Sequence, residues 1–295
     1  MYFFHYDEPL FRPPSEAESL IFQITLGCSH NGCRFCGMYK MKRFRLRSLD
    51  EILAEINAIP ERYRPLVRRV FLADGDALVY PQSGLATILD ALSETFPGLT
   101  RVGAYASPQS LTTKSGDDLA LLREKKLRIL YFGLESGDAE TLLMVNKGYG
   151  PEEMLQLCRK AQDAGLKLSV TAILGLAGRV RSAEHAAATA AWVNALSPEY
   201  FSLLTMFVRH NDEFLASIEP LTHGEILEET LALLLRLEPQ RTILRSNHVS
   251  NFLNLAGSYP KDRQRLIDTA AAALAEAKRR PGWSCQVPAY KEEYF

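Results

Sequence analysis

The sequence predicts an α/β fold: a partial (β/α)6 barrel of TIM type, followed by a mainly helical C-terminal extension. Three observations support this prediction. Apolar, β-branched segments alternate six times with segments of helical period between residues 20 and 205. Each pair occupies roughly 31 residues, the length of one βαβ step. A closed barrel of eight steps needs about 250 residues, so six steps leave residues 206–295 outside a partial barrel.

The expected elements follow in a regular order. The first helix has a clear start signal, because Ser48 can act as N-cap and Glu51 stands three residues later. Residues 1–19 are expected to form an N-terminal extension, 20–205 the core and 206–295 an extension packed on the barrel. The expected strands are Leu20–Leu26, Arg69–Ala73, Arg101–Ala106, Arg128–Gly133, Leu166–Leu174 and Tyr200–Thr205, and the expected helices are Ser48–Ile59, Gln82–Thr95, Thr112–Lys125, pieces of Asp138–Ala164, Ser182–Leu196, Gly224–Leu237 and Lys261–Arg280.

The composition excludes several classes of protein. There are 34 Lys and Arg against 35 Asp and Glu, a net charge of −1, which argues against a polyelectrolyte as the main partner. No apolar run approaches the roughly 18 to 20 residues of a membrane span. Residues 1–14 lack the basic and apolar regions of a signal peptide. We therefore expect a cytoplasmic protein with no membrane partner.

The cysteines carry the strongest functional signal. There are five, an odd number that argues against a disulfide framework. Cys28, Cys33 and Cys36 fall within nine residues, whereas Cys158 and Cys285 are isolated and are interpreted as packing thiols. The clustered three predict a metal site.

Three interpretations of this cluster remain open. A structural zinc site needs four ligands, and His30, the only nearby candidate, lies inside the loop between two cysteines. An iron–sulfur cubane held by three thiolates would keep one iron open for another ligand, which explains a motif that stops at three. The third interpretation is three unligated thiols. The spacing of the three cysteines favours the iron–sulfur cubane.

Polar residues follow the predicted strands. In a barrel of parallel strands, the chemistry lies on the loops at the carboxyl ends of the strands. The cysteine loop follows the first strand, and we expect the other residues to converge on the same face. They are Asp74 and Asp76, Ser107 and Gln109, Glu135 and Ser136, and Gly175 and Arg179.

A three-cysteine loop after the first strand of such a barrel resembles the radical S-adenosylmethionine (SAM) superfamily. The resemblance covers about residues 20–205 and implies a [4Fe–4S] cluster on Cys28, Cys33 and Cys36, with SAM bound at the open iron. Family members usually have three residues between the first two cysteines, whereas four stand here. The aromatic residue before the last cysteine, Phe35, also fits the family, where it packs near the adenine.

Three further motifs strengthen the resemblance, and they assign residues to the binding of SAM. Ala73–Ala77 is similar to the family's Gly-Gly-Glu segment, with Gly75 and Asp76 in matching positions and Asp74 in place of the first glycine. Phe132–Gly137 resembles a motif of oxygen-independent coproporphyrinogen oxidases and methylthiotransferases. Ile173–Gly178 is similar to the segment that contacts adenine. The residues thereby assigned are Asp74, Gly75, Asp76, Glu135, Ser136, Gly175 and Arg179.

The resemblance implies a radical enzyme. An electron from the reduced cluster cleaves SAM to methionine and a 5′-deoxyadenosyl radical, which abstracts hydrogen from a small-molecule substrate. A reductant such as flavodoxin or ferredoxin is the implied partner. The cofactors supply the difficult step, so no catalytic acid or base is required, and His248 is the one candidate proton donor. The alternative is a non-catalytic zinc or iron–sulfur module that binds nucleic acid or a protein.

Two segments bear on the substrate. Six basic residues lie between Arg34 and Arg47, and they could bind phosphate or carboxylate groups or form a solvated loop. In the extension, a polar cluster follows an apolar segment and is expected to border the open side of the barrel. Its candidate substrate-binding residues are Arg245, Asn247, His248 and Asn251.

Overall fold

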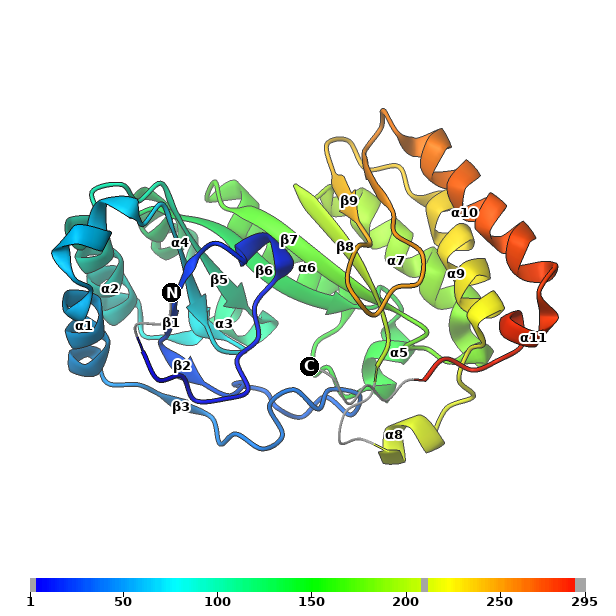
Figure 1. Ribbon diagram of the computed structural model, residues 1–295, viewed down its shortest axis with the longest axis horizontal. Helices are drawn as coiled ribbons and strands as arrows, with labels where there is room; N and C mark the ends of the chain where they lie inside the picture. Colours follow the sequence, from blue (N-terminus) through cyan, green and yellow to red (C-terminus); the bar gives the residue numbers. More distant parts are fainter. Residues whose placement is uncertain (1–3, 208–211, 290–295) are drawn as a thin grey trace. The chain divides into compact units, whose positions relative to one another are not determined.

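The computed structural model describes residues 4–207 and 212–289 (Figure 1). Within these residues, eight strands form one sheet in the order β1-β4-β5-β6-β7-β8-β9-β10, and β2 and β3 form a small second sheet. Strands β1, β4, β5 and β6 pair in parallel, as do β7, β8 and β9, whereas β10 is antiparallel to β9. This confirms the predicted α/β class. The strands are β1 Leu20–Gln23, β2 Thr25–Leu26, β3 Arg45–Leu46, β4 Arg69–Ala73, β5 Arg101–Ala106, β6 Leu127–Glu135, β7 Lys167–Leu174, β8 Tyr200–Thr205, β9 Ile243–Arg245 and β10 Ala256–Ser258.

Helices alternate with the strands through the core and dominate the C-terminal extension. Several start at capping boxes, in which a side chain accepts a hydrogen bond from the backbone of the first turn; Ser48 of α1 confirms the sequence prediction. In the described ranges, no helix is both long enough and apolar enough to cross a membrane. The helices are α1 Leu49–Ala58, α2 Gln82–Thr95, α3 Pro108–Thr112, α4 Gly116–Glu124, α5 Ala139–Met144, α6 Pro151–Asp163, α7 Ser182–Leu196, α8 Asp212–Ala216, α9 His223–Arg236, α10 Arg263–Lys278 and α11 Pro281–Ser284.

The chain divides into two compact units. The first contains residues up to Asn31, Met38–Phe132 and Leu157–Leu168; the second contains Gly32–Gly37, Gly133–Gln156 and the chain from Ser169 onward. The chain passes between the units within β6, α6 and β7. The boundaries predicted at residues 20 and 206 stay predictions.

The first unit has a core of buried strands covered by helices. Phe22 of β1 and Phe71 of β4 are fully buried, and the ring of Phe22 lies 6.4 Å from that of Phe96 after α2. Strand β4 is buried along almost its whole length, as expected for a parallel strand with both faces covered. Helix α1 packs on α2, and α2 on α4; in Figure 1 these helices lie along one side of their strands.

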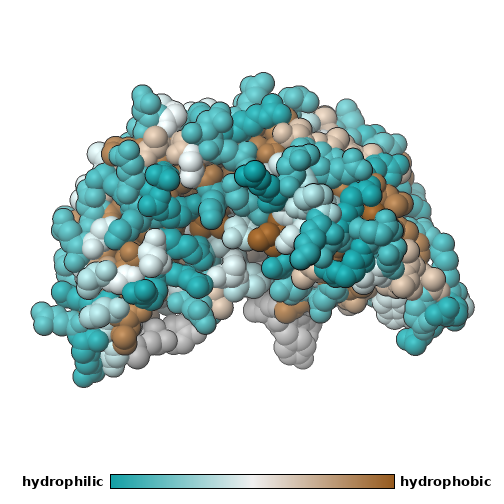
Figure 2. Space-filling model, turned by 90° about the horizontal axis from the view of Figure 1, so that it is seen from above, coloured by the Kyte–Doolittle hydropathy of each residue, from teal (hydrophilic) through white to brown (hydrophobic). Residues whose placement is uncertain are grey.

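The second unit packs successive helix layers on its strands. Helix α9 contacts both α7 and α10, and in Figure 1 the three follow one another outward from β8 and β9. Leu233 and Leu234 of α9 are fully buried. The face seen in Figure 2 is mostly hydrophilic with scattered apolar residues, as the balanced composition leads one to expect.

The structure corrects four predicted elements. The expected strand Leu20–Leu26 is divided into β1 and β2, because residues 25 and 26 pair antiparallel with β3 rather than with β4. The helix expected from Thr112 is two helices, α3 and α4, since Ser115 caps a new start. Strand β6 extends to Glu135. The C-terminal extension, predicted to be mainly helical, also contributes β9 and β10 to the sheet, and Arg245 is the last residue of β9.

Candidate active site

Cys28 lies directly against the turn that follows β4. The main-chain N–H of Gly75 donates to the oxygen of Gly27, at 3.1 Å. A Cβ placed on Gly75 would come within 2.9 Å of the Cβ of Cys28 and 2.8 Å of the Tyr39 ring. Only glycine leaves room for this approach. The structure thus brings Cys28 together with the segment Asp74–Asp76, two features that the sequence places after neighbouring parallel strands.

Asp76 accepts hydrogen bonds from serine hydroxyl groups in two other turns of the first unit. Its Oδ2 accepts from Ser29 Oγ at 2.5 Å and from Ser107 Oγ at 2.6 Å. The side chain is fully buried, and no described residue donates to its Oδ1. Burial raises the pKa of Asp76, and the hydroxyl hydrogen bonds oppose that rise. A buried carboxylate oxygen with unused accepting capacity is suited to a cationic ligand.

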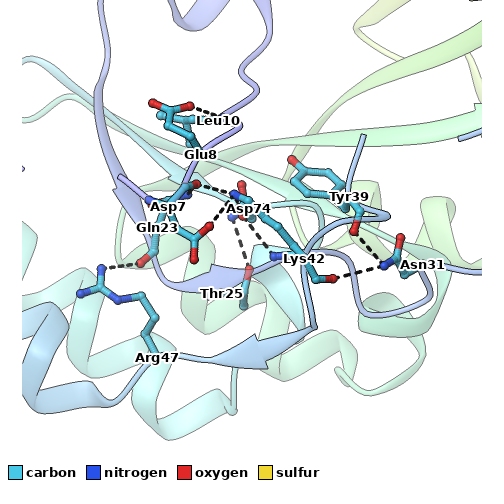
Figure 3. Close-up of polar contacts among 11 residues, drawn as sticks. Asp7, Glu8, Leu10, Gln23, Thr25, Asn31, Tyr39, Lys42, Arg47 and Asp74 are labelled. Atoms are coloured by element: carbon cyan, nitrogen blue, oxygen red, sulfur yellow. Dashed lines mark hydrogen bonds and ion pairs between the residues drawn. The ribbon is translucent and has the colours of Figure 1, made fainter. Parts of the chain in front are cut away.

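Asp74 bonds to the protein itself through one carboxylate oxygen, Oδ2 (Figure 3), whereas no described residue donates to its buried Oδ1. Its Oδ2 lies 3.0 Å from Lys42 Nζ and 3.1 Å from the N–H of Gly27, and it is fully buried. Burial raises the pKa of Asp74, while Lys42 acts in the opposite direction. The Asp74 N–H donates to Thr25 Oγ1 at 3.3 Å. The side chain that stands in place of the family's glycine therefore holds the start of the cysteine loop.

Cys33 and Cys36 belong to the second unit, in the short segment Gly32–Gly37. The N–H of Arg34 donates to the oxygen of Val145 at 2.9 Å, and its guanidinium donates to the oxygen of Met144 at 3.2 Å. These carbonyls end helix α5, where the helix offers them no internal donor. Asn146 Nδ2 donates to the oxygen of Gly32 at 3.0 Å. The segment is thus fastened to a helix C-terminus.

Phe35, between these two cysteines, is buried. Its ring centroid lies 6.5 Å from that of Phe214 in α8, an edge contact within the second unit. Such packing limits the freedom of the segment that carries Cys33 and Cys36. The five cysteines are all thiols, and the three of the motif are half-buried.

Glu135 and Ser136 end β6 with their side chains in different surroundings. Glu135 has φ +66° and its carboxylate lies 2.9 Å from Lys147 Nζ. Ser136 is fully buried; its Oγ lies 2.8 Å from His185 Nδ1 and accepts from the N–H of Asp138 at 3.0 Å. The Ser136 hydroxyl is therefore part of an internal network.

That network continues to the turn after β7. Gly175 has φ +80°, and its N–H donates to Glu229 Oε1 at 2.7 Å; Glu229 Oε2 accepts from Ser182. His185 Nε2 lies 3.8 Å from Glu229 Oε1, and both side chains are fully buried. Ser136, His185, Glu229 and Gly175 thereby join the turns after β6 and β7.

Sequence reasoning missed His185 and Glu229. A signal was present, because Glu229 stands three residues after Ile226 and four before Leu233, on the apolar face of α9. His185 likewise adjoins the buried Ala186 in α7. A charged residue at a core position of an amphipathic helix indicates a buried polar network.

Arg179 forms ion pairs on the surface of the second unit. Its Nε lies 2.6 Å from Glu225 Oε1 and its Nη1 3.4 Å from Glu219, and its side chain is 47% exposed. Its neighbour Arg181, which was not predicted, holds both oxygens of Asp138, the N-cap of α5, at 2.8 and 2.9 Å. Arg181 thus contacts the start of α5, the helix whose other end binds the segment with Cys33 and Cys36, whereas Arg179 makes no such contact among the described residues.

The predicted substrate cluster has one fully engaged member. Asn251 accepts from the N–H and the hydroxyl of Thr205 and donates to Leu203 O and Ser246 Oγ, all between 2.7 and 2.9 Å. It fastens its loop to the carboxyl end of β8. His248 Nδ1 accepts from the Ser250 N–H at 3.2 Å, and burial lowers the pKa of His248. Asn247 and Arg245 are exposed.

The basic segment does not form one continuous patch. Lys42 is buried against Asp74, and Arg47 makes a paired contact with Glu55 at 2.7 and 2.9 Å. Lys40 donates to the oxygen of Asn31 at 3.2 Å. Among the basic residues of this segment that belong to the first unit, Lys40, Arg43 and Arg45 are exposed.

The donor types present suit a three-thiolate cluster with an amino-acid ligand. Three thiols stand in one sequence motif, a glycine is required beside Cys28, and a buried carboxylate oxygen of Asp76 is unused by the described residues. Within the described ranges, no group of three His, Cys, Asp or Glu side chains lies so that it could hold a metal ion; Cys28 belongs to one unit and Cys33 and Cys36 to the other. Sulfur donors suit iron–sulfur clusters.

This combination of an α/β fold and a cysteine motif after the first strand defines a class of iron–sulfur enzymes. The model of the "Radical SAM superfamily" matches residues 22–190, more than half of the chain. The chain belongs to the radical SAM superfamily. It is an enzyme of this superfamily, and its cofactors are a [4Fe–4S] cluster and SAM.

Individual relatives are distant. The heme chaperone HemW of Bacillus subtilis (strain 168) is 21% identical over 194 residues, 63% of this chain and 50% of HemW. The coproporphyrinogen III oxidase HemN of Escherichia coli, described as a radical SAM enzyme, has a TM-score of 0.52 at 18% identity, covering 88% of this chain and 52% of its own. Methylornithine synthase (PylB) has a TM-score of 0.53 at 13% identity, with 88% and 81% covered. These likenesses show the fold, and the chain spans about half the length of the curated relative.

Proposed function

We propose that Cys28, Cys33 and Cys36 hold the [4Fe–4S] cluster and that the turns after β4, β6 and β7 hold SAM. The observation that carries the proposal is the buried Asp76, whose Oδ1 is unused by the described residues and whose turn packs on Cys28. The ordered motifs of the sequence and the superfamily match add Cys33 and Cys36. Glu135, Ser136, Gly175 and Arg179 are included on the strength of those motifs.

Once reduced by one electron from a reductant, a cluster held by Cys28, Cys33 and Cys36 would supply the electron for cleavage of SAM to methionine and a 5′-deoxyadenosyl radical, the species that would take hydrogen from a small substrate. The chain's own residues bind and orient. Asp76 receives the ammonium group of SAM, while Ser29 and Ser107 fix the rotamer of its carboxylate. Phe35 excludes water beside the adenine.

Several residues act at one remove from SAM. Gly75 leaves the main chain open to the ligand, and Asp74 acts by holding the loop rather than by touching SAM. Ser136 and Gly175 present their main chains, because the Ser136 hydroxyl and the Gly175 N–H are already bonded within the protein. Arg179 is in reach of an anionic group only if it leaves Glu225.

The substrate and the reductant belong to the same proposal. The exposed Arg245 and Asn247 are offered to a small substrate, with His248 as the proton donor, whereas Asn251 supports their loop. An acidic reductant such as flavodoxin or ferredoxin suits the exposed Lys40, Arg43 and Arg45. We assign the enzyme to the cytoplasm because its five cysteines are all thiols.

The test is cleavage of SAM by the reconstituted enzyme. The protein is loaded anaerobically with iron and sulfide, then incubated with dithionite and SAM, and 5′-deoxyadenosine is measured by mass spectrometry. Cys33→Ala removes one motif thiol, and Cys285→Ala, which removes an exposed thiol elsewhere, is the matched control.

We expect 5′-deoxyadenosine from the wild type and from Cys285→Ala but none above background from Cys33→Ala. Equal product from Cys33→Ala would exclude this cysteine as a cluster ligand. A wild-type protein that holds the cluster, fails to bind SAM and gives no product would contradict the assigned SAM site.

A further inference from the structure

The stretch of chain that carries all three motif cysteines has both ends bonded to one oxygen atom. Asp74 Oδ2 accepts from the main-chain N–H of Gly27, the residue before Cys28, at 3.1 Å. The same oxygen accepts from Nζ of Lys42, six residues after Cys36, at 3.0 Å. Figure 3 shows Asp74 and Lys42 facing each other beside Thr25. A single carboxylate thus closes the loop that the cysteines occupy.

This contact is shielded from water. The Asp74 side chain is 0% exposed and that of Lys42 is 4% exposed. Removing one member of a buried ion pair leaves the other charge uncompensated in the interior. A surface pair would contribute little and would not fix a loop. The burial therefore makes it costly to separate Asp74 from Lys42 and so to open the loop.

Lys42 is held in place from a second direction. Its Nζ also donates to the main-chain oxygen of Asp7 and lies 3.6 Å from the carboxylate of Asp7. Asp7 in turn exchanges two hydrogen bonds of 2.9 Å with the side-chain amide of Gln23, in β1. The lysine is consequently positioned by the N-terminal segment and by the strand that leads to the cysteines.

Further hydrogen bonds join the two ends of the stretch. Asn31 Nδ2 donates to the oxygen of Tyr39 at 2.9 Å and to that of Lys42 at 3.4 Å. The N–H of Lys42 donates to the oxygen of Tyr39 at 3.0 Å. These three bonds are neutral, whereas the contact of Lys42 with Asp74 is an ion pair.

We propose that Asp74 and Lys42 are positioning residues for the iron–sulfur cluster. Their buried ion pair holds the ends of the cysteine stretch together, so that the thiols are placed before iron and sulfide arrive and resist separation afterwards. The inference rests on the proposed function, since it takes the three cysteines as the cluster ligands. The competing explanation is that the hairpin of β2 and β3 closes the loop and the ion pair serves only the stability of the fold.

Four variants separate these explanations. Lys42→Met keeps most of the side-chain volume and removes the charge, and Asp74→Asn keeps the shape of the carboxylate. The double variant Lys42→Met with Asp74→Asn removes both charges, so it leaves no unpaired charge in the interior. Glu55→Gln breaks the pair with Arg47, at the other end of the same hairpin, and is the matched control.

The readouts are the iron and sulfide bound per chain after anaerobic reconstitution, the half-life of the cluster absorbance in an iron chelator, and the melting temperature without the cluster. We expect the cluster half-life to fall about 10- to 100-fold in both single variants, the usual effect of losing a residue that orients metal ligands. The double variant should regain much of the melting temperature yet keep the short half-life. Glu55→Gln should match the wild type in both.

Lys42→Arg tests the same idea without loss of charge. It should lengthen the half-life relative to Lys42→Met, because a cation again faces Asp74. If the cluster half-life follows the melting temperature through all variants, including its recovery in the double variant, the pair serves the fold alone and this inference is overturned. A wild-type protein that takes up no cluster would instead overturn the proposed function.

Discussion

The two units fasten their parts of one cysteine motif by different means. In the first, Cys28 lies beside a turn that Asp74 secures through a buried ion pair. In the second, the segment around Cys33 and Cys36 is secured by hydrogen bonds from the main chain and the guanidinium of Arg34 to carbonyls at the end of α5. A buried ion pair leaves an uncompensated charge when either partner is lost, whereas the main-chain bond from Arg34 to Val145 survives most side-chain changes. The first attachment is therefore the more vulnerable to mutation.

Each unit also contains a buried carboxylate, Asp76 or Glu229, that accepts hydrogen bonds from groups in the turns after strands. Asp76 of the first unit belongs to such a turn itself, and one of its oxygens is unused by the described residues. Glu229 of the second unit reaches its turn from helix α9, and both of its oxygens accept hydrogen bonds. Asp76 therefore has an oxygen available to a ligand, whereas Glu229 uses both of its oxygens to stabilise the fold.

The sharpest test of this comparison is Glu229→Ala. Its loss leaves the Gly175 N–H and the Ser182 hydroxyl without their acceptor, and each unsatisfied buried group costs about 1–3 kcal/mol. We expect the free energy of unfolding, measured in urea, to fall by roughly 3–5 kcal/mol. Glu228→Ala, an exposed neighbour on the same helix paired with Lys278, should change it by less than about 0.5 kcal/mol. A similar loss in both variants would show that Glu229 is not a hub of the second unit.

Asp76→Asn tests the other side of the comparison. The amide keeps the shape of the side chain and an acceptor for Ser29 or Ser107 but loses the charge that we assign to the SAM ammonium. A hydrogen bond to a charged group contributes about 1.5–3 kcal/mol, so SAM affinity should fall roughly 10- to 100-fold. Equilibrium dialysis of the cluster-loaded protein measures it. Unchanged affinity would place the ammonium elsewhere.

Whether a contact could be predicted from the sequence depends on how far apart its residues lie along the chain. The cysteine motif and the turn Asp74–Asp76 could be recognised because their residues are contiguous, and the alternation of strands and helices places them at the same edge of a parallel sheet. The strand-pairing partner of residues 25 and 26 could not be recognised, since two-residue strands such as β3 have no period to detect.

The hydrogen-bond and ion-pair partners of Asp74 and Gly175 could not be predicted from the sequence, for a different reason. Lys42 and Asp74 are 32 residues apart, and Gly175 and Glu229 are 54 apart. A run of basic residues does not show which lysine will be buried, because burial depends on the tertiary packing of other segments. For the same reason the sequence could not show that Asn251, predicted to bind a substrate, also bonds to Thr205.

The pH dependence of the stability of α5 tests the helix to which the Cys33–Cys36 segment of the second unit is attached. The Arg181 guanidinium lowers the pKa of Asp138 to about 2, below the ordinary value near 3.8. A carboxylate with a lowered pKa stabilises the fold above about pH 4, and this contribution is lost as the pH falls towards 2. Asp138 also caps the helix, so Asp138→Ala should cost about 1–2 kcal/mol at pH 7.

That difference should shrink in urea unfolding at pH 3. The Asp138 carboxylate of the unfolded chain, with its ordinary pKa near 3.8, is then mostly protonated, which favours unfolding, whereas the folded carboxylate with its pKa of about 2 stays mostly ionised. Thr141→Val is a useful comparison, since it removes only the hydroxyl bonded to Asp138. A gap between wild type and Asp138→Ala that is the same at both pH values would mean that the ionised form contributes nothing.

The smallest expected effect concerns Asn146, which donates to the oxygen of Gly32 at 3.0 Å and has φ +54°. Asn146→Gly removes the hydrogen bond but adopts the same backbone conformation easily, so we expect a loss of about 0.5 kcal/mol or less and a cluster half-life close to that of the wild type. Asn146→Ala adds the cost of a left-handed alanine, about 1 kcal/mol. Both are measured by urea unfolding and by cluster loss in a chelator. A glycine variant that loses its cluster as fast as Lys42→Met would show that the second attachment depends on a side chain after all, and the contrast between the two units would fail.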